Sequence, residues 1–278
     1  AGLAWAVRSP ATVAAMDLRA VAERAALAGG AVIRRAGLAG WGAPDLKGAA
    51  GDYVTAVDRE SEQAVASFLA QETGIPVVGE EGWGAGEAGD RYWLVDPLDG
   101  TTNFVHGFPA MGVSVALVEA GRPVAGAVHA PFLGETWSAA AGEGCWFRRD
   151  GEEARARRVR VSERPIERAV VATGFPFRRK DLLERYLAVF RGALERFEDL
   201  RRPGAASLDL AWVASGVFEG FFELALSPWD VAAGGLLIQE AGGVVTDWTG
   251  GDGWLSGDIL AGPPSVHGEL LRLVGRAT

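Results

Sequence analysis

The chain has 278 residues, of which 49% are hydrophobic, and it carries a net charge of −9. This length allows one large domain or two small ones, with enough apolar side chains for a sizeable core. No apolar run approaches the ~18–20 residues that cross a bilayer, so we expect no membrane partner. The acidic balance also predicts no nucleic-acid partner, because such a partner requires a basic surface.

The cellular compartment is indicated by the cysteine content and by the first residues. Cys145 is the only cysteine, which excludes an internal disulfide and suits a reducing compartment. Arg8, Asp17 and Arg19 place charges early in the chain, and no signal-peptide pattern is present. We therefore expect a cytoplasmic protein.

The amino-acid usage is unusual in two respects. Only Lys47 and Lys180 are lysines among 27 cationic residues, and Asn103 is the only asparagine. Scarcity of heat-labile residues is compatible with a thermophilic source, although scarce lysine runs against the thermophile trend. A GC-rich genome explains the same excess of Ala, Gly and Arg, so both explanations stay open.

Periodicity predicts alternating helices and strands in the first half of the chain. A helix is expected over residues 13–35, a short extended piece over 52–55, a helix over 61–70 and a strand over 75–79. A glycine-rich loop over 82–90 precedes a strand that ends at 93–95. Two strands, 113–118 and 124–128, form a predicted hairpin, followed by short strands within 134–146 and at 159–161.

The second half continues with a strand over 169–172, helices over 182–196 and 207–215, and a strand over 218–226. Ser227, Pro228 and Asp230 suit the N-cap, N1 and N3 positions of a helix that ends at Glu240. No linker or repeat interrupts the chain. We expect residues 1–278 to form a single domain, with an N-terminal half of about 1–150 and a C-terminal half of about 151–278.

The segment from Trp93 to Phe104 carries the strongest chemical signal. Its apolar strand leads to Asp96 and Asp99, which are followed by Gly100 and Thr101. Carboxylate oxygens suit a hard divalent cation, and free backbone N–H groups in a Gly/Thr turn suit a phosphate. An acidic protein that binds phosphate needs local positive charge, for which metal ions are the natural source.

Other acids also stand at the ends of predicted elements: Asp52, Asp58, Glu80, Glu81 and Asp230. An isolated acid is usually a solvated surface residue. The apolar residues before Glu80 and Asp96 favour buried positions instead. Acids at the ends of buried strands repel one another unless they are protonated or bind a metal.

In their order and spacing, residues 52–58, 79–82, 96–104 and 229–234 resemble the inositol monophosphatase family of magnesium-dependent, lithium-sensitive phosphatases. The resemblance covers the chain from Lys47 to Gly243. It implies an α+β fold, a five-layer α/β/α/β/α sandwich of the sugar-phosphatase type. It also implies a homodimer, which the sequence itself does not indicate.

The resemblance implies two or three Mg²⁺ ions per subunit. One is held by Glu80, Asp96 and the backbone carbonyl of Leu98, a second by Asp96, Asp99 and Asp230, and a third, weaker ion reaches Glu80 through water. Gly100 and Thr101 would offer backbone N–H groups to the phosphate. Thr101 together with Glu80 or Asp58 would orient the attacking water. Lys47, Asp52 and Glu81 would play supporting roles, although a plain surface position stays open for Lys47 and Glu81.

For the substrate, the resemblance implies myo-inositol 1-phosphate, hydrolysed by metal-activated water. Asp99, Ala206 and Glu223 match positions that contact the inositol ring. Ser227 departs from the histidine often found three residues before the second-metal aspartate.

Two alternatives remain. One is a fructose-1,6-bisphosphatase or a dual-specificity enzyme, with Arg178, Arg179 and Lys180 either binding a second phosphate or forming a solvated turn. The other is a non-catalytic regulatory protein on the same fold. This second alternative predicts that at least one metal ligand has been lost, and none of the ligands that the resemblance implies is missing.

Overall fold

The structure, a computed structural model, describes residues 16–38, 45–46, 53–84, 89–152, 155–177 and 179–277. A seven-stranded sheet with the order β3-β4-β5-β6-β7-β8-β9 dominates the first half. Its strands are β3 (Val77–Gly79), β4 (Arg91–Asp99), β5 (Gly112–Glu119), β6 (Arg122–Ala130), β7 (Glu135–Ala140), β8 (Gly144–Arg149) and β9 (Arg157–Val159). β3 lies parallel to β4, and every later neighbouring pair is antiparallel.

A five-stranded sheet with the order β11-β10-β12-β14-β13 forms the second half. Its strands are β10 (Val170–Thr173), β11 (Asp199–Arg201), β12 (Gly220–Glu223), β13 (Val244–Thr246) and β14 (Ile259–Gly262). Because β10 and β12 are parallel neighbours, their carboxyl ends meet at one edge of this sheet. β1 (Asp45–Leu46) and β2 (Tyr53–Val54) form a separate antiparallel pair.

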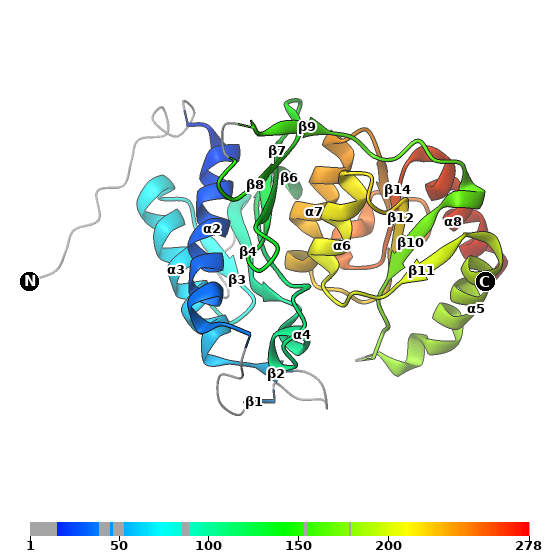
Figure 1. Cartoon of the computed structure of the whole chain (residues 1–278), viewed down its shortest axis with the longest axis horizontal. Coiled ribbons are helices and arrows are strands. Elements are labelled where there is room, and N and C mark those ends of the chain that lie inside the picture. Colours follow the sequence, from blue (N-terminus) through cyan, green and yellow to red (C-terminus); the bar gives the residue numbers. More distant parts are fainter. Residues whose placement is uncertain are drawn as a thin grey trace, which may run out of the picture.

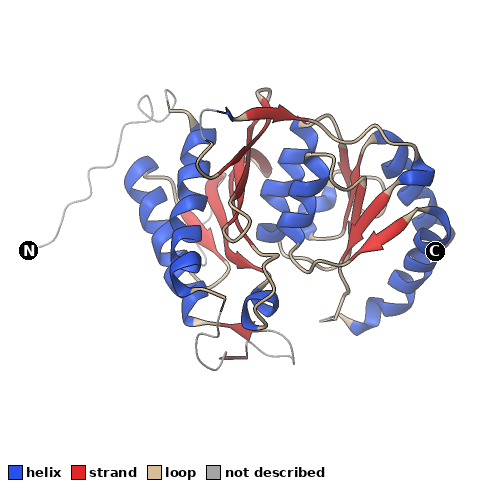
Figure 2. Cartoon of the chain, in the orientation of Figure 1, coloured by secondary structure: helices blue, strands red, loops and turns tan. Residues whose placement is uncertain are grey.

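Helices complete five layers (Figures 1 and 2). α2 (Leu18–Ala36) and α3 (Ala56–Thr73) cover the outer face of the seven-stranded sheet, and α6 (Ala206–Ala214) and α7 (Pro228–Glu240) lie between the sheets. α5 (Leu183–Arg196) and α8 (Pro264–Ala277) cover the far face of the five-stranded sheet, and α4 (Thr101–Val105) follows β4. Short 3₁₀ helices span Ile166–Arg168, Lys180–Leu182 and Gly253–Ser256. The expected five-layer sandwich is confirmed. Within the described residues, none of the helices combines the length and apolarity needed to cross a membrane.

The strand expected to end at Val95 instead continues to Asp99. Asp96 pairs with Ser114 and Asp99 with Gly112, so the register shifts between the two aspartates. Three steps along β4 therefore match two along β5, which is the definition of a bulge. Pro97 lies inside the shift and has no N–H for the ladder, which accounts for the irregularity.

Other helices and strands also begin or end at residues different from those expected, for local reasons. α3 begins five residues before the expected start because Thr55 caps it; its N–H donates to Asp58 Oδ2 over 2.7 Å in a capping box. The strand expected over 218–226 covers only Gly220–Glu223. Ala225 ends the extended backbone with a φ of +60°. The sequence analysis did not anticipate β13, β14 and α8.

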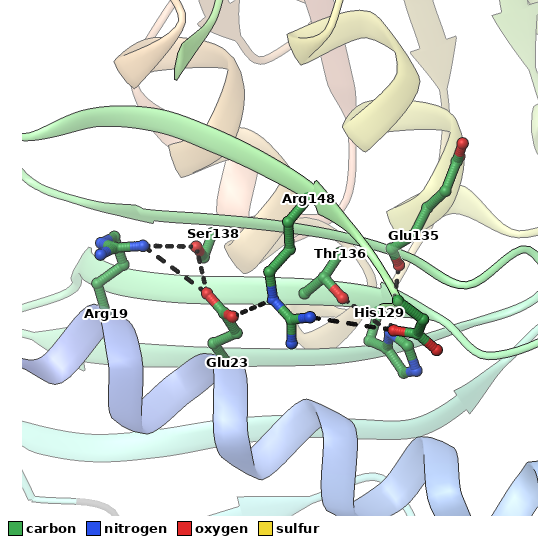
Figure 3. Close-up of polar contacts among 8 residues, drawn as sticks. Arg19, Glu23, His129, Glu135, Thr136, Ser138 and Arg148 are labelled. Carbon is green, nitrogen blue, oxygen red and sulfur yellow. Dashed lines mark hydrogen bonds and ion pairs between the residues drawn. The ribbon is translucent and has the colours of Figure 1, made fainter. Parts of the chain in front are cut away.

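Polar contacts fix α2 on the seven-stranded sheet (Figure 3). Glu23 accepts a hydrogen bond from Ser138 on β7 (3.0 Å) and forms an ion pair with Arg148 on β8. Arg19 also donates to Ser138 over 3.1 Å. These contacts set the position of the helix along the strands.

Beneath the same helix, His129 is fully buried on β6. Its Nδ1 lies 3.0 Å from Thr136 Oγ1, and burial lowers the pKa of the imidazole to about 4. A Cβ on Gly30 of α2 would lie 2.2 Å from the ring, so the helix approaches this closely only because residue 30 is glycine. The packing of α2 thus depends on a glycine–histidine contact.

We predict that Gly30→Ala destabilises the protein, because a buried, hydrogen-bonded ring cannot move aside; overpacking of this kind costs about 1–3 kcal/mol. Gly268→Ala is the matched control, since Gly268 lies exposed in α8 and an added Cβ would meet nothing within 4 Å. That change should stabilise by roughly 0.5–1 kcal/mol. Urea unfolding measures both, and effects of the same sign would contradict the packing argument.

Candidate active site

Three carboxylates converge where β4 ends and α7 begins. Asp96, Asp99 and Asp230 each offer an oxygen, and these oxygens lie within 4.8 Å of one another. In a regular strand, residues three apart point to opposite faces. The bulge in β4 removes that difference, so Asp96 and Asp99 reach the same site.

Backbone and side-chain donors hold each carboxylate in place. Asp96 Oδ1 accepts from the Leu98 N–H (3.0 Å). Asp99 Oδ2 accepts from the N–H (2.7 Å) and hydroxyl (2.6 Å) of Ser207, in the first turn of α6. Asp230 Oδ2 accepts from the Ser227 N–H (2.7 Å) in the predicted capping arrangement of α7. Two helix N-termini therefore support this acidic cluster.

The electrostatics of the cluster are unfavourable without a cation. Burial raises the pKa of Asp99 to about 6 and that of Asp230 to about 8, and nearby acids add to both effects. Burial, followed by the charge of Glu80, holds the pKa of Asp96 well above its usual range. A divalent cation with oxygen ligands relieves this repulsion, so the donor set fits Mg²⁺.

Glu80 joins the cluster from the turn after β3. Its N–H donates to Val95 O over 3.1 Å. Glu62 of α3 holds the turn by accepting the N–H groups of Glu81 (2.7 Å) and Trp83 (3.0 Å). The sequence analysis missed Glu62. In the sequence, Glu62 stands at helical spacing from the apolar residues Val65 and Leu69, which are buried in the structure, and this spacing was the signal for an inward-facing acid.

Thr101 stands beside the acids at the start of α4. Its hydroxyl lies 3.0 Å from Asp58 Oδ1 and 3.1 Å from the Leu98 carbonyl. Asp58 is buried, and its Oδ2 accepts hydrogen bonds in the cap of α3, so the direction of its Oδ1 toward Thr101 is fixed. Gly100, which precedes Thr101, has a φ of +91°, a backbone conformation that residues with a side chain rarely adopt.

The single asparagine of the chain connects two loops at this site. The Asn103 side-chain N–H₂ donates to Ala110 O (2.6 Å) and to Pro203 O (2.9 Å). It thereby joins the β4–β5 connection to the loop that leads into α6. This is a structural reason for the asparagine in the motif.

One pocket gathers most of the predicted site residues. Its lining includes Glu80, Asp96, Leu98, Asp99, Gly100, Thr101, Ala206, Glu223 and Asp230. Asp58 accepts a hydrogen bond from the lining residue Thr101, and Glu81 is absent from the described lining. Lys47 and Asp52 lie outside the described residues.

The lining residues that were not predicted include Gly174, Arg202 and Asp209. A Cβ on Gly174 would lie 2.1 Å from Glu223 Oε1, so glycine makes room for that carboxylate. The Arg202 guanidinium lies 5.3 Å from the Phe175 ring and is the one cation in the described lining. In the expected basic run, Arg179 pairs with Asp181 (2.7 Å), and Arg178 is outside the described residues.

We predict that the metal-free protein loses stability as pH rises from about 6.5 to 8. Asp230 keeps its proton in the fold up to a pKa of about 8, whereas the unfolded chain has released it. His129 has a lowered pKa in the fold, so it adds a slope of opposite sign only where the unfolded imidazole still holds its proton, and this contribution fades above about pH 6.5. Thermal unfolding in chelator measures this slope. Asp230→Asn should make the slope shallower, with the remainder due to other buried acids such as Asp96, and an equal slope in the variant would contradict the assignment.

Comparison with known proteins agrees with this geometry. The model of the inositol monophosphatase family matches residues 15–277. The chain is 43% identical over 232 residues to the putative Nus factor SuhB of Neisseria meningitidis serogroup B, which covers 81% of this chain and 85% of that protein.

Two solved structures are also similar. The extragenic suppressor protein suhB from Bartonella henselae has a TM-score of 0.84 and 37% identity, covering 93% of this chain and 98% of that one. The Thermotoga maritima IMPase has a TM-score of 0.80 and 32% identity, with 94% and 98% covered. The chain therefore belongs to the inositol monophosphatase family, whose members are in general magnesium-dependent phosphatases.

Proposed function

We propose that this protein hydrolyses myo-inositol 1-phosphate to inositol and phosphate in the presence of Mg²⁺. The observation that carries the proposal is the convergence of Asp96, Asp99 and Asp230 beside Thr101, in a pocket that also contains Glu223. Family membership supports the phosphatase activity. The inositol ester is the more specific part of the proposal.

The ligands for two Mg²⁺ ions would be Glu80, Asp96, Asp99, Asp230 and the carbonyl of Leu98, with Glu80 also near a third. Bound metal supplies charge neutralisation for the phosphate and the leaving alkoxide, and lowers the pKa of water. The raised pKa values of the aspartates support this role, because a cation would favour their ionised forms.

The chain's own residues position the reactants. Thr101 donates its hydroxyl proton to Asp58, so its oxygen lone pair is free to accept a hydrogen bond from the attacking water. Gly100 and Thr101 would donate backbone N–H groups to the phosphate. Ala206, Glu223 and one oxygen of Asp99 would receive the ring. No cysteine or histidine occurs in the described lining, so direct attack by water is favoured over a covalent intermediate.

Arg202 supports one alternative substrate. Its guanidinium lines the pocket, where it would pair with a second phosphate of fructose 1,6-bisphosphate. A separate, regulatory function is suggested by the name Nus factor given to the Neisseria relative. We further propose that the protein is inhibited by lithium, forms a homodimer, works in the cytoplasm and comes from a thermophilic source.

We predict that Asp99→Asn lowers kcat/KM at least about 10²–10³-fold, the scale on which single electrostatic groups act in catalysis. The fold should persist, because the amide oxygen still accepts from Ser207. Circular dichroism checks the fold, and Asp90→Asn, at an exposed turn, is the matched control. Near-normal turnover by Asp99→Asn would refute the role of this cluster.

A second experiment compares esters by phosphate release, with and without Mg²⁺. We predict Mg²⁺-dependent release that favours myo-inositol 1-phosphate over fructose 1,6-bisphosphate. Arg202→Ala should leave this preference in place. A preference for the bisphosphate that disappears in Arg202→Ala would support the alternative substrate, and no release from either ester would favour the regulatory function.

A further inference from the structure

A carboxyl group outside the cation cluster lies in the same pocket. Asp209 on α6 is 1% exposed, and its Oδ1 has no hydrogen-bond partner among the described residues. A buried polar atom without a partner costs free energy, and such atoms are rare in native proteins. An unsatisfied acceptor in the lining of a ligand pocket indicates that the ligand supplies the partner.

Helical geometry and charge place Asp209 on the alcohol side of the pocket. Ala206 and Asp209 are three residues apart on α6, so they share a face, and both line the pocket. Burial, followed by the charges of Glu223 and then Asp99, raises the pKa of Asp209, whereas Arg202 lowers it. The neighbours of Asp209 therefore include Glu223, at the end of β12, rather than the acids of the cation cluster alone.

Small residues lie near this pair in a lining that also contains Phe177, Arg202 and Leu226. Gly174 leaves the space that Glu223 occupies, and Ala205 and Ala206 complete the same lining. The two carboxyl groups offer hydrogen-bond acceptors next to these small residues. Hydroxyl groups on neighbouring carbons of a ring can donate to both carboxyl groups, whereas an aromatic or aliphatic alcohol without further hydroxyls leaves them without donors.

We propose that Asp209 is a specificity-determining residue whose Oδ1 accepts a hydrogen bond from one ring hydroxyl of the substrate, next to the hydroxyl received by Glu223. It selects phosphate monoesters of polyols that carry hydroxyls on neighbouring carbons. This inference rests on the proposed phosphatase function of the same pocket. Asp209 binds neither cation nor phosphate in this scheme, so it acts on substrate choice.

The test is a ratio of kcat/KM values, for myo-inositol 1-phosphate over phenyl phosphate, with Mg²⁺. Asp209→Ala should lower this ratio about tenfold, the effect of one lost hydrogen bond, mainly through KM for the inositol ester. Asp209→Asn keeps an amide oxygen at the same place and should retain most of the ratio. A purely structural role would change both substrates alike, and an unchanged ratio would overturn the proposal.

Glu219→Gln is the control for removing a buried acid, because Glu219 is fully buried, pairs with Arg164 and is absent from the described pocket lining. It should lower thermal stability and leave the ratio unchanged. If Asp209→Ala does not fold, deoxy analogues of the inositol ester test the wild-type protein. Removal of one ring hydroxyl other than those assigned to Glu223, Asp99 and Ala206 should then lower kcat/KM by a similar factor, and the absence of such a position would overturn the proposal.

The outcomes separate this inference from the proposed function. If the wild-type protein releases phosphate from neither ester, the phosphatase proposal fails, and the inference about Asp209 fails with it. If the wild-type protein hydrolyses both esters and Asp209→Ala keeps the same ratio, only the inference about Asp209 fails.

Discussion

The bulge in β4 is the constraint on which the site depends. Without it, Asp96 and Asp99 would point to opposite faces of the seven-stranded sheet. With three residues of β4 matched to two of β5, both carboxylates meet Asp230 within 4.8 Å. Pro97 makes this irregularity compatible with the ladder, because a proline contributes no N–H to it.

Bringing these acids together costs free energy, and the fold offsets part of the cost with fixed donors. The first turns of α6 and α7 supply N–H groups to Asp99 and Asp230. Both helices lie between the two sheets, so the site forms only when both halves of the chain pack against this layer. The remaining repulsion is what a bound cation would relieve.

The pocket separates two kinds of chemistry. The acids of β4 and α7 stand where the cation and the phosphate are expected, and Asp58 fixes the direction of Thr101 beside them. Glu223 and Asp209 stand where the alcohol is expected, in a lining that includes the small residues Gly174, Ala205 and Ala206. Family relatives can thus share the first set of residues while differing in the ester that the second set accepts.

The sequence by itself identified the family through four short motifs, and the resemblance to that family implied the five-layer fold. It also predicted most of the acids that the structure brings together in one pocket, because each of them stands inside one of these motifs. It also determined the start of α7, where Ser227, Pro228 and Asp230 act within one helical turn. Only the tertiary structure decided the contacts of Glu62 and Ser207 and the position of Asp209 in the pocket lining. Each of these residues gains its meaning from a partner or a pocket formed by another part of the chain, and helical or strand periodicity carries no information about such contacts.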